Sequence, residues 1–237
     1  MADVNLNELE NSLHVAKRAN YMFTNCYQYY QEKRKYDSKK FIVFRVDVDY
    51  DLEAAPLLLD VFRKFGIKAT FFLRMYANEY NVFSKKSEKI ISLIKSEMHE
   101  IGVHTELMDI KKIYSIKSDQ VLKDDIKKLE EFYNIKIFGS ACHRERDGEN
   151  NLLFWQENSS KKFNLKYEAY DQEKEFGLFH NSFYISDSEW HNWKNYENGN
   201  KVESNYNLTQ AIYQEKKRIY LLVHTDTFGG EKKKNAK

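Results

Sequence analysis

The sequence contains few of the residues that interrupt or cross-link a chain. Its 237 residues include one proline, eight glycines and two cysteines. Two cysteines, Cys26 and Cys142, are too few for a disulfide framework and indicate a reducing setting. No segment is long and apolar enough for a membrane span, and the polar, acidic first residues are unlike a signal peptide. We therefore expect a cytoplasmic protein without a membrane span.

An excess of charge of one sign is also missing. The chain has 38 basic and 36 acidic side chains, with a net charge of +2. No basic stripe interleaved with aromatic residues is present, so we expect no nucleic-acid partner. Hydrophobic residues at 42% and charged residues at 31% are typical of a globular protein. The length suits a single domain over residues 1–237, with a helical N-terminal extension over 1–38 and a basic tail over 231–237.

Apolar runs typical of strands alternate with amphipathic patterns typical of helices. The patterns predict strands at 41–48, 67–73, 100–104, 135–141, 165–170, 179–186 and 218–224. They predict helices at 6–31, 56–66, 87–97, 118–134, 150–156 and 207–217. This alternation favours an α/β fold with a parallel sheet and crossover helices. We expect a distorted (β/α) barrel of about seven parallel strands; a doubly wound open sheet is the alternative.

Titratable side chains gather where the predicted strands end. In the stretch FRVDVDY, Asp47 and Asp49 are two residues apart, so both lie on one face of a strand together with Arg45. Other predicted strands run into polar residues at their carboxyl ends, namely His104, His143, Arg144, Asp187, Trp190 and His224. The carboxyl ends of barrel strands form one mouth, where active sites lie. Carboxylates and imidazoles from separate strands are therefore expected to converge there.

This set of side chains suits metal-assisted hydrolysis. Carboxylate oxygens and imidazole nitrogens bind Zn²⁺ and other first-row divalent metals, usually with three protein ligands at a catalytic site. Asp49, His104 and one further group could hold one divalent ion, for which zinc is the expected metal. Asp47 could then take a proton from water as the general base, and His224 could protonate the leaving group.

Four stretches resemble motifs of the polysaccharide deacetylase family. They are FRVDVDYD, FGIKATFFL at Phe65–Leu73, HEIGVHTE at His99–Glu106 and LLVHTD at Leu221–Asp226. The resemblance extends from about Phe41 to Phe228 and implies a distorted (β/α) barrel that removes an N-acyl group, usually acetyl, from an amino sugar. It also implies the roles given above for Asp47, Asp49, His104 and His224.

The family usually has a second metal-binding histidine four residues after the first, where this chain has Met108. A thioether is a poor replacement for imidazole on zinc, so another donor is needed. Asp109 and Glu106 are near in sequence, but we expect His143, because it comes from the end of the next strand. Arg144 is expected to support Asp47. We expect Asp187 and Trp190 to contact the substrate.

The leading interpretation is a cytoplasmic metal-dependent deacetylase acting on a small N-acylated sugar or a glycan intermediate, with surface polysaccharide synthesis as a setting. A degenerate deacetylase-like protein that binds carbohydrate is the first alternative. A D-x-D pair also occurs in haloacid-dehalogenase-like phosphatases, which need a later lysine and an acidic pair for magnesium. A glycosyltransferase with D-x-D as its metal site would leave the histidines at 104, 143 and 224 without a role.

Overall fold

The computed structural model describes residues 5–144, 150–171, 173, 175–188 and 192–229. Its strands are β1 (Met22–Thr24), β2 (Phe41–Val48), β3 (Thr70–Arg74), β4 (Glu100–Thr105), β5 (Gly139–Cys142), β6 (Tyr167–Glu168), β7 (Phe183–Ser186), β8 (Lys194–Glu197), β9 (Asn200–Val202) and β10 (Arg218–His224). Its helices are α1 (Leu6–Arg18), α2 (Cys26–Glu32), α3 (Ala55–Phe65), α4 (Lys85–Ser96), α5 (Leu107–Tyr114), α6 (Ser118–Tyr133), α7 (Leu152–Glu157), α8 (Leu208–Tyr213) and α9 (Thr225–Phe228).

The ten strands of the described residues belong to one sheet, whose main path is β6-β5-β4-β3-β2-β10-β7-β8-β9. The neighbours from β6 to β7 along this path are parallel, whereas β7-β8-β9 are antiparallel. The predicted α/β fold with a parallel sheet is therefore confirmed. Within the described residues the path has two ends, β6 and β9, so closure into a seven-stranded barrel stays a prediction.

Strand β2 shows how the sequence separates the two faces of this sheet. All eight of its residues are buried, as expected for a central parallel strand. Phe44 and Val46 belong to the large apolar core on the side of the helices. Val43 belongs to a second core rich in aromatic residues, and Arg45 and Asp47 share its face by strand alternation. The two aspartates therefore lie on the inner face, as predicted from their spacing.

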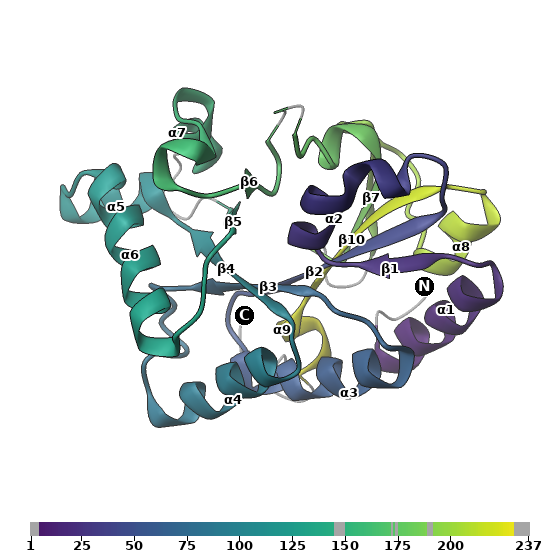
Figure 1. Ribbon diagram of the computed structural model, residues 1–237, viewed down its shortest axis with the longest axis horizontal. Coiled ribbons are helices and arrows are strands. Elements are labelled where there is room, and N and C mark those ends of the chain that lie inside the picture. The colour runs from purple at the N-terminus through teal and green to yellow at the C-terminus, as the bar shows by residue number, and fades with distance from the viewer. Residues whose placement is uncertain (1–4, 145–149, 172, 174, 189–191, 230–237) are drawn as a thin grey trace.

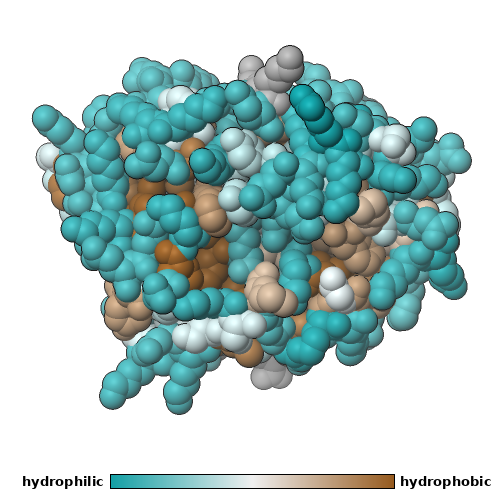
Figure 2. All heavy atoms as spheres, viewed as in Figure 1, coloured by the Kyte–Doolittle hydropathy of each residue, from teal (hydrophilic) through white to brown (hydrophobic). Residues whose placement is uncertain are grey.

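Helices cover the outer face of the sheet. In Figure 1, α3 and α4 lie along the lower side, α5 and α6 along the left, and α1 and α8 along the right. Helix α3 carries Pro56 in its first turn and ends at Gly66, whose φ of 68° gives the left-handed C-cap that glycine adopts without strain. The face in Figure 2 is mostly hydrophilic, with hydrophobic residues visible between the hydrophilic ones. No helix among the described residues has the length and apolar character that a membrane crossing requires.

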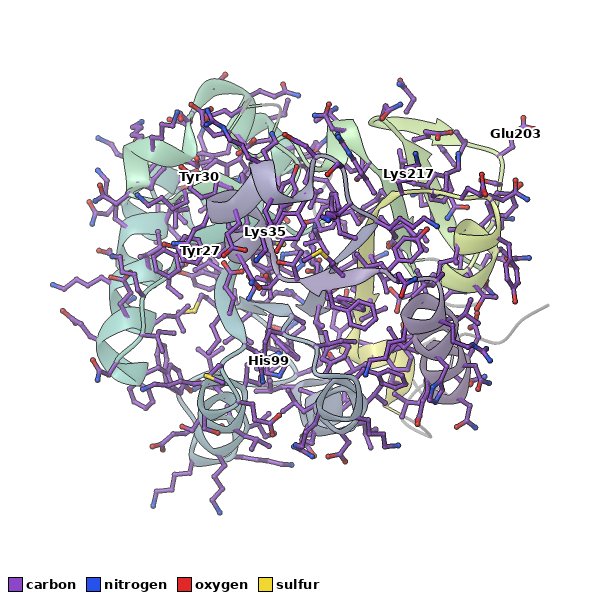
Figure 3. The ribbon with its side chains drawn as sticks, turned by 45° about the vertical axis from the view of Figure 1, so that its right-hand side comes forward. Tyr27, Tyr30, Lys35, His99, Glu203 and Lys217 are labelled. Atoms are coloured by element: carbon purple, nitrogen blue, oxygen red, sulfur yellow. The ribbon has the colours of Figure 1, made fainter. Side chains whose placement is uncertain are left out.

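The prediction of a single helix over residues 6–31 is wrong, because strand β1 separates two helices there. Helix α1 ends at Arg18, Asn20 has a positive φ, and Asn25 caps the start of α2. Helix α2, on which Tyr27 and Tyr30 lie in Figure 3, covers the amino ends of the strands. The backbone N–H of Tyr27 donates to Glu100 at the start of β4, and Tyr27 stacks on Phe138 just before β5. This end is opposite to the carboxyl ends, where the titratable residues gather.

Candidate metal and catalytic site

The predicted site residues meet at the carboxyl ends of four strands. Asp47 is the last residue of β2 whose side chain is on the inner face, and Asp49 directly follows this strand. His104 lies near the end of β4, His143 follows β5, and His224 is the last residue of β10. They line a cavity of about 120 Å³ at these strand ends. The expected convergence of carboxylates and imidazoles is thus present.

Asp49, His104 and His143 form the group that could hold a metal ion. Each offers one ligand atom, and these atoms lie within 4.8 Å of one another. The Nε2 atom of His104 is 3.1 Å from Oδ1 of Asp49, and Nε2 of His143 is 3.5 Å from Oδ2 of Asp49. Two ligands that are each about 2.0–2.1 Å from a tetrahedral zinc ion lie about 3.3 Å apart. The observed separations therefore suit a common ion, and the role of these residues as ligands stays a prediction.

The hydrogen bonds of the two histidines also suit a cation. Nδ1 of His104 is 2.9 Å from the carbonyl oxygen of Ala141, which can only accept, so the neutral form of this imidazole, the form that binds a metal, has its proton on Nδ1 and its lone pair on Nε2. Oδ1 of Asp49 and Nε2 of His143 are buried and have no hydrogen-bond partner in the part of the chain that the structure describes. Unpartnered buried polar atoms are unusual in native proteins and often mark a missing ion or water. The donor atoms present therefore fit a divalent metal.

The two other donors considered for the missing histidine are held elsewhere. Asp109 accepts a hydrogen bond of 2.8 Å from Nδ2 of Asn151, whose Oδ1 accepts from the backbone of Met108 and Asp109. Glu106 accepts a hydrogen bond of 2.8 Å from Nη2 of Arg74. Among the described residues, neither carboxylate belongs to the group that could bind a metal. The geometry thus favours His143.

Asp47 is held by Arg45, its neighbour on the same face of β2. Nε and Nη2 of Arg45 donate to Oδ1 and Oδ2 of Asp47 at 2.8 and 2.7 Å, and both side chains are buried. Burial by itself would raise the pKa of Asp47, but Arg45 and His104 outweigh it and lower this pKa. Asp47 is therefore ionised at neutral pH, as a general base must be.

The prediction that Arg144 supports Asp47 is wrong. Arg144 is exposed, and its Nη2 is 3.4 Å from the hydroxyl of Tyr50. The chain leaves the sheet after Cys142, so Arg144 lines the cavity as an exposed residue, whereas Arg45 is buried in β2 and binds Asp47 directly. Arg45 takes the role that we had given to Arg144.

His224 is held by Asp187, which follows β7. Nδ1 of His224 donates to Oδ1 of Asp187 at 2.5 Å, and the backbone N–H of His224 donates to Oδ2 at 2.9 Å. Burial would lower the pKa of His224, but Asp187, Asp49 and Asp47 outweigh it and raise this pKa to about 10. The imidazole is therefore protonated at neutral pH and can act as an acid.

This contact corrects the role predicted for Asp187. Its carboxylate is buried and both oxygens are bound by His224, so it orients the imidazole instead of contacting substrate. Trp190, the other predicted substrate contact, lies outside the described residues.

A larger cleft of about 960 Å³ opens beside the cavity. The two share His143, Arg144 and Tyr170, so the cleft leads directly to the titratable groups. Aromatic side chains from separate segments line it, among them Trp155 of α7 and Tyr196 of β8. Its volume is at the upper end of the usual range for ligand pockets, about 300–1,000 Å³.

The antiparallel hairpin of β8 and β9 forms part of the wall of this cleft, and the sequence prediction missed it. Its turn is Asn198–Gly199, with φ values of 50° and 79°. Asn-Gly between short extended segments is the strongest local signal of a hairpin, so the sequence did carry the information.

Comparisons with known proteins agree with this fold. Residues 34–141 match the family model described as polysaccharide deacetylase. The polysaccharide deacetylase of Bacillus cereus shares 16% identity over 81% of this chain and 82% of its own, with a TM-score of 0.50. A Streptococcus pyogenes deacetylase in complex with acetate also shares 16% identity, over 68% of this chain and 70% of its own, with a TM-score of 0.50.

A mutant of a CE4 family pseudoenzyme with restored activity matches at 16% identity and a TM-score of 0.47, over 80% of this chain. The chain spans 59% of that protein's length. A search of curated proteins gives no match. The family match over residues 34–141, the part that carries Asp47, Asp49 and His104, agrees with the family predicted from the motifs. At these identities the solved structures establish the fold alone.

Proposed function

We propose that this protein is a metal-dependent carbohydrate deacetylase that hydrolyses an N-acyl, usually N-acetyl, group of an amino sugar. One observation carries the proposal. An ionised carboxylate, Asp47, and a protonated imidazole, His224, lie beside the group of Asp49, His104 and His143. The match to the polysaccharide deacetylase family supports the reaction class.

The residues of the site divide the reaction between them. Asp49, His104 and His143 would hold one divalent ion, for which we propose zinc, and that ion supplies Lewis acidity at the acyl carbonyl. Asp47 takes a proton from water while the oxygen of that water forms the new bond to the carbonyl carbon. His224 gives its Nε2 proton to the amine nitrogen as the C–N bond breaks. The products are a carboxylic acid and a free amino sugar.

Arg45 and Asp187 set the protonation states that this reaction needs. Arg45 binds both oxygens of Asp47 and keeps the base ionised. Asp187 binds Nδ1 of His224, which leaves the proton on Nε2 available to the leaving group. Nε2 of His224 is 3.8 Å from Oδ2 of Asp49, so the acid is beside the proposed metal site.

The cleft supports a glycan of more than one sugar unit as the substrate. Its volume of about 960 Å³ and its aromatic side chains suit sugar rings, which stack on aromatic faces, and it leads to the cavity through Tyr170. Both cysteines are free and buried, in keeping with the cytoplasmic location that we propose. A cytoplasmic intermediate of surface polysaccharide synthesis is the setting that we propose for this reaction.

Acetate release from N-acetylglucosamine oligomers of increasing length, with zinc-loaded protein, tests this function. We expect turnover, and we expect Asp47→Asn and His224→Ala to lower the rate on the order of 10²- to 10⁴-fold while the metal stays bound. His14→Ala is the matched control, because this histidine packs against Phe65 at the helix layer. Oligomer binding by wild type without any acetate release would favour the alternative of a degenerate carbohydrate-binding protein.

A further inference from the structure

A buried ion pair lies directly behind the proposed metal ligands. Arg74 ends β3 and Glu106 follows β4, and their side chains are 0% and 2% exposed. Nη2 of Arg74 donates to Oε1 of Glu106 at 2.8 Å. Nη1 of the same guanidinium donates to the backbone carbonyl of Asp49 at 2.8 Å. One arginine therefore connects Glu106 to the segment that carries a proposed ligand.

Glu106 in turn faces His143. Its Oε1 is 3.4 Å from Nδ1 of His143, and the opposite nitrogen, Nε2, faces Oδ2 of Asp49 at 3.5 Å. Among the described residues, neither nitrogen of His143 has a partner that meets hydrogen-bond geometry, although both are buried. A carboxylate beside Nδ1 favours the tautomer with a proton on Nδ1 and a lone pair on Nε2. That tautomer is the one a metal ligand requires at this position.

This arrangement lies where the chain departs from the family, since Met108 stands in the place of the second metal-binding histidine. His143 comes from another strand than His104, and its ring must be brought to Asp49 by contacts of its own. Glu106 is placed two residues after His104, so the end of β4 supplies both a ligand and the partner of the other imidazole. Met108, at the position of the missing histidine, lies in the first turn of α5.

We propose that Glu106 and Arg74 are positioning residues that make His143 a metal ligand. Glu106 fixes the tautomer and ring orientation of His143 through Nδ1. Arg74 compensates the buried charge of Glu106 and holds the backbone of Asp49 at the same time. This inference rests on the proposed metal site, because without an ion the orientation of Nε2 has no consequence.

A merely structural pair would have a different signature. A buried ion pair whose only role is to join β3 to β4 would affect unfolding and leave the affinity of the folded protein for metal unchanged. Partners that orient metal-bound histidines typically contribute 10- to 100-fold in metal affinity. Metal affinity measured on folded protein therefore separates the two roles without any measurement of turnover.

The test is titration of metal-free protein with Zn²⁺, and the absorption spectrum of the Co²⁺-loaded protein, for wild type, Glu106→Gln and Glu106→Asp. Glu100→Gln is the matched control, because Glu100 is a buried glutamate at the other end of β4 that binds Thr70 and Tyr167. We expect Glu106→Gln to bind zinc about 10- to 100-fold more weakly, with an altered Co²⁺ spectrum, and Glu100→Gln to bind like wild type. Glu106→Asp keeps the charge but shortens the side chain, so it should also lose affinity; it provides the measurement if Glu106→Gln does not fold.

The positioning role is overturned if both Glu106 variants fold and their zinc affinities and Co²⁺ spectra equal those of wild type. If wild type also releases acetate, the proposed function stands while this inference fails. If Glu106→Gln loses affinity but wild type releases no acetate from any oligomer, the inference stands and the proposed function fails. A wild-type protein that binds neither Zn²⁺ nor Co²⁺ overturns both.

Discussion

Removal of Arg45 should be among the most damaging single changes in this protein. Arg45 is 0% and Asp47 2% exposed, and two hydrogen bonds of 2.7 and 2.8 Å join them. The change Arg45→Met keeps an unbranched apolar stem but removes the guanidinium, which lies over the rings of Phe72 and Tyr170, and it leaves Asp47 buried without its partner. Breaking a buried ion pair by removing one partner costs about 3–5 kcal/mol. We therefore expect Arg45→Met to lose about this much free energy of unfolding at pH 7.

The same reasoning predicts what happens when both charges are removed. Arg45→Met with Asp47→Asn removes both charges of this buried pair, so the double variant should be more stable than Arg45→Met alone. Arg63→Met is the matched surface control: Arg63 bonds Asp60 and Glu97 but is 55% exposed, and we expect a loss of at most about 1 kcal/mol. Urea unfolding at pH 7 measures all four proteins. An Arg45→Met variant that loses no more than Arg63→Met, or a double variant less stable than Arg45→Met, would refute the argument.

Two further predictions concern protonation. His99 is buried between β4 and α3 (Figure 3), and burial and then Lys68 lower its pKa from 6.5 to about 4. The unfolded chain therefore binds a proton that the folded protein does not, so His99 removes up to about 3 kcal/mol of stability as the pH falls from 6.5 to 4. His99→Gln should make urea unfolding less dependent on pH over this interval, and an identical pH dependence would count against it. Asp187→Asn removes the carboxylate that raises the pKa of His224, so we expect slower acetate release and an alkaline limb of the rate profile at lower pH. An alkaline limb at the wild-type position would contradict that role for Asp187.

The sequence predicted the central strands well because they carry strong, simple signals. Strands β2 and β10 are continuous apolar runs, and β2 appears with the bounds predicted from its composition. The N-terminal region was mispredicted because α1 and α2 have helical patterns on both sides of a three-residue strand. A strand this short gains its stability from pairing with Phe41–Val43, which is a contact that no local pattern reveals.

For the site, the sequence predicted which titratable residues come together, but it predicted less well which side chains bind one another. Convergence at the strand ends follows from parallel topology, and it brought Asp49, His104 and His143 together as expected. The partners were harder to predict. The alternation of β2 already placed Arg45 on the face of Asp47, but we assigned that role to Arg144, because nothing in the sequence shows where the chain goes after β5. Arg74 and Glu106 were not predicted as a pair because their contact depends on the register of β3 with β4.

The site itself is tested most directly by a structure of the zinc-loaded protein with anomalous scattering at the zinc edge, together with the metal content of wild type, Asp49→Ala and His104→Ala. We predict one zinc ion per chain in wild type, with Nε2 of His143 and Nε2 of His104 each about 2.0–2.1 Å from it and a carboxylate oxygen of Asp49 completing the protein ligands. Both variants should lose the metal. An ion bound by Asp109 or Glu106 with the His143 ring turned away, or full metal content in both variants, would contradict the account.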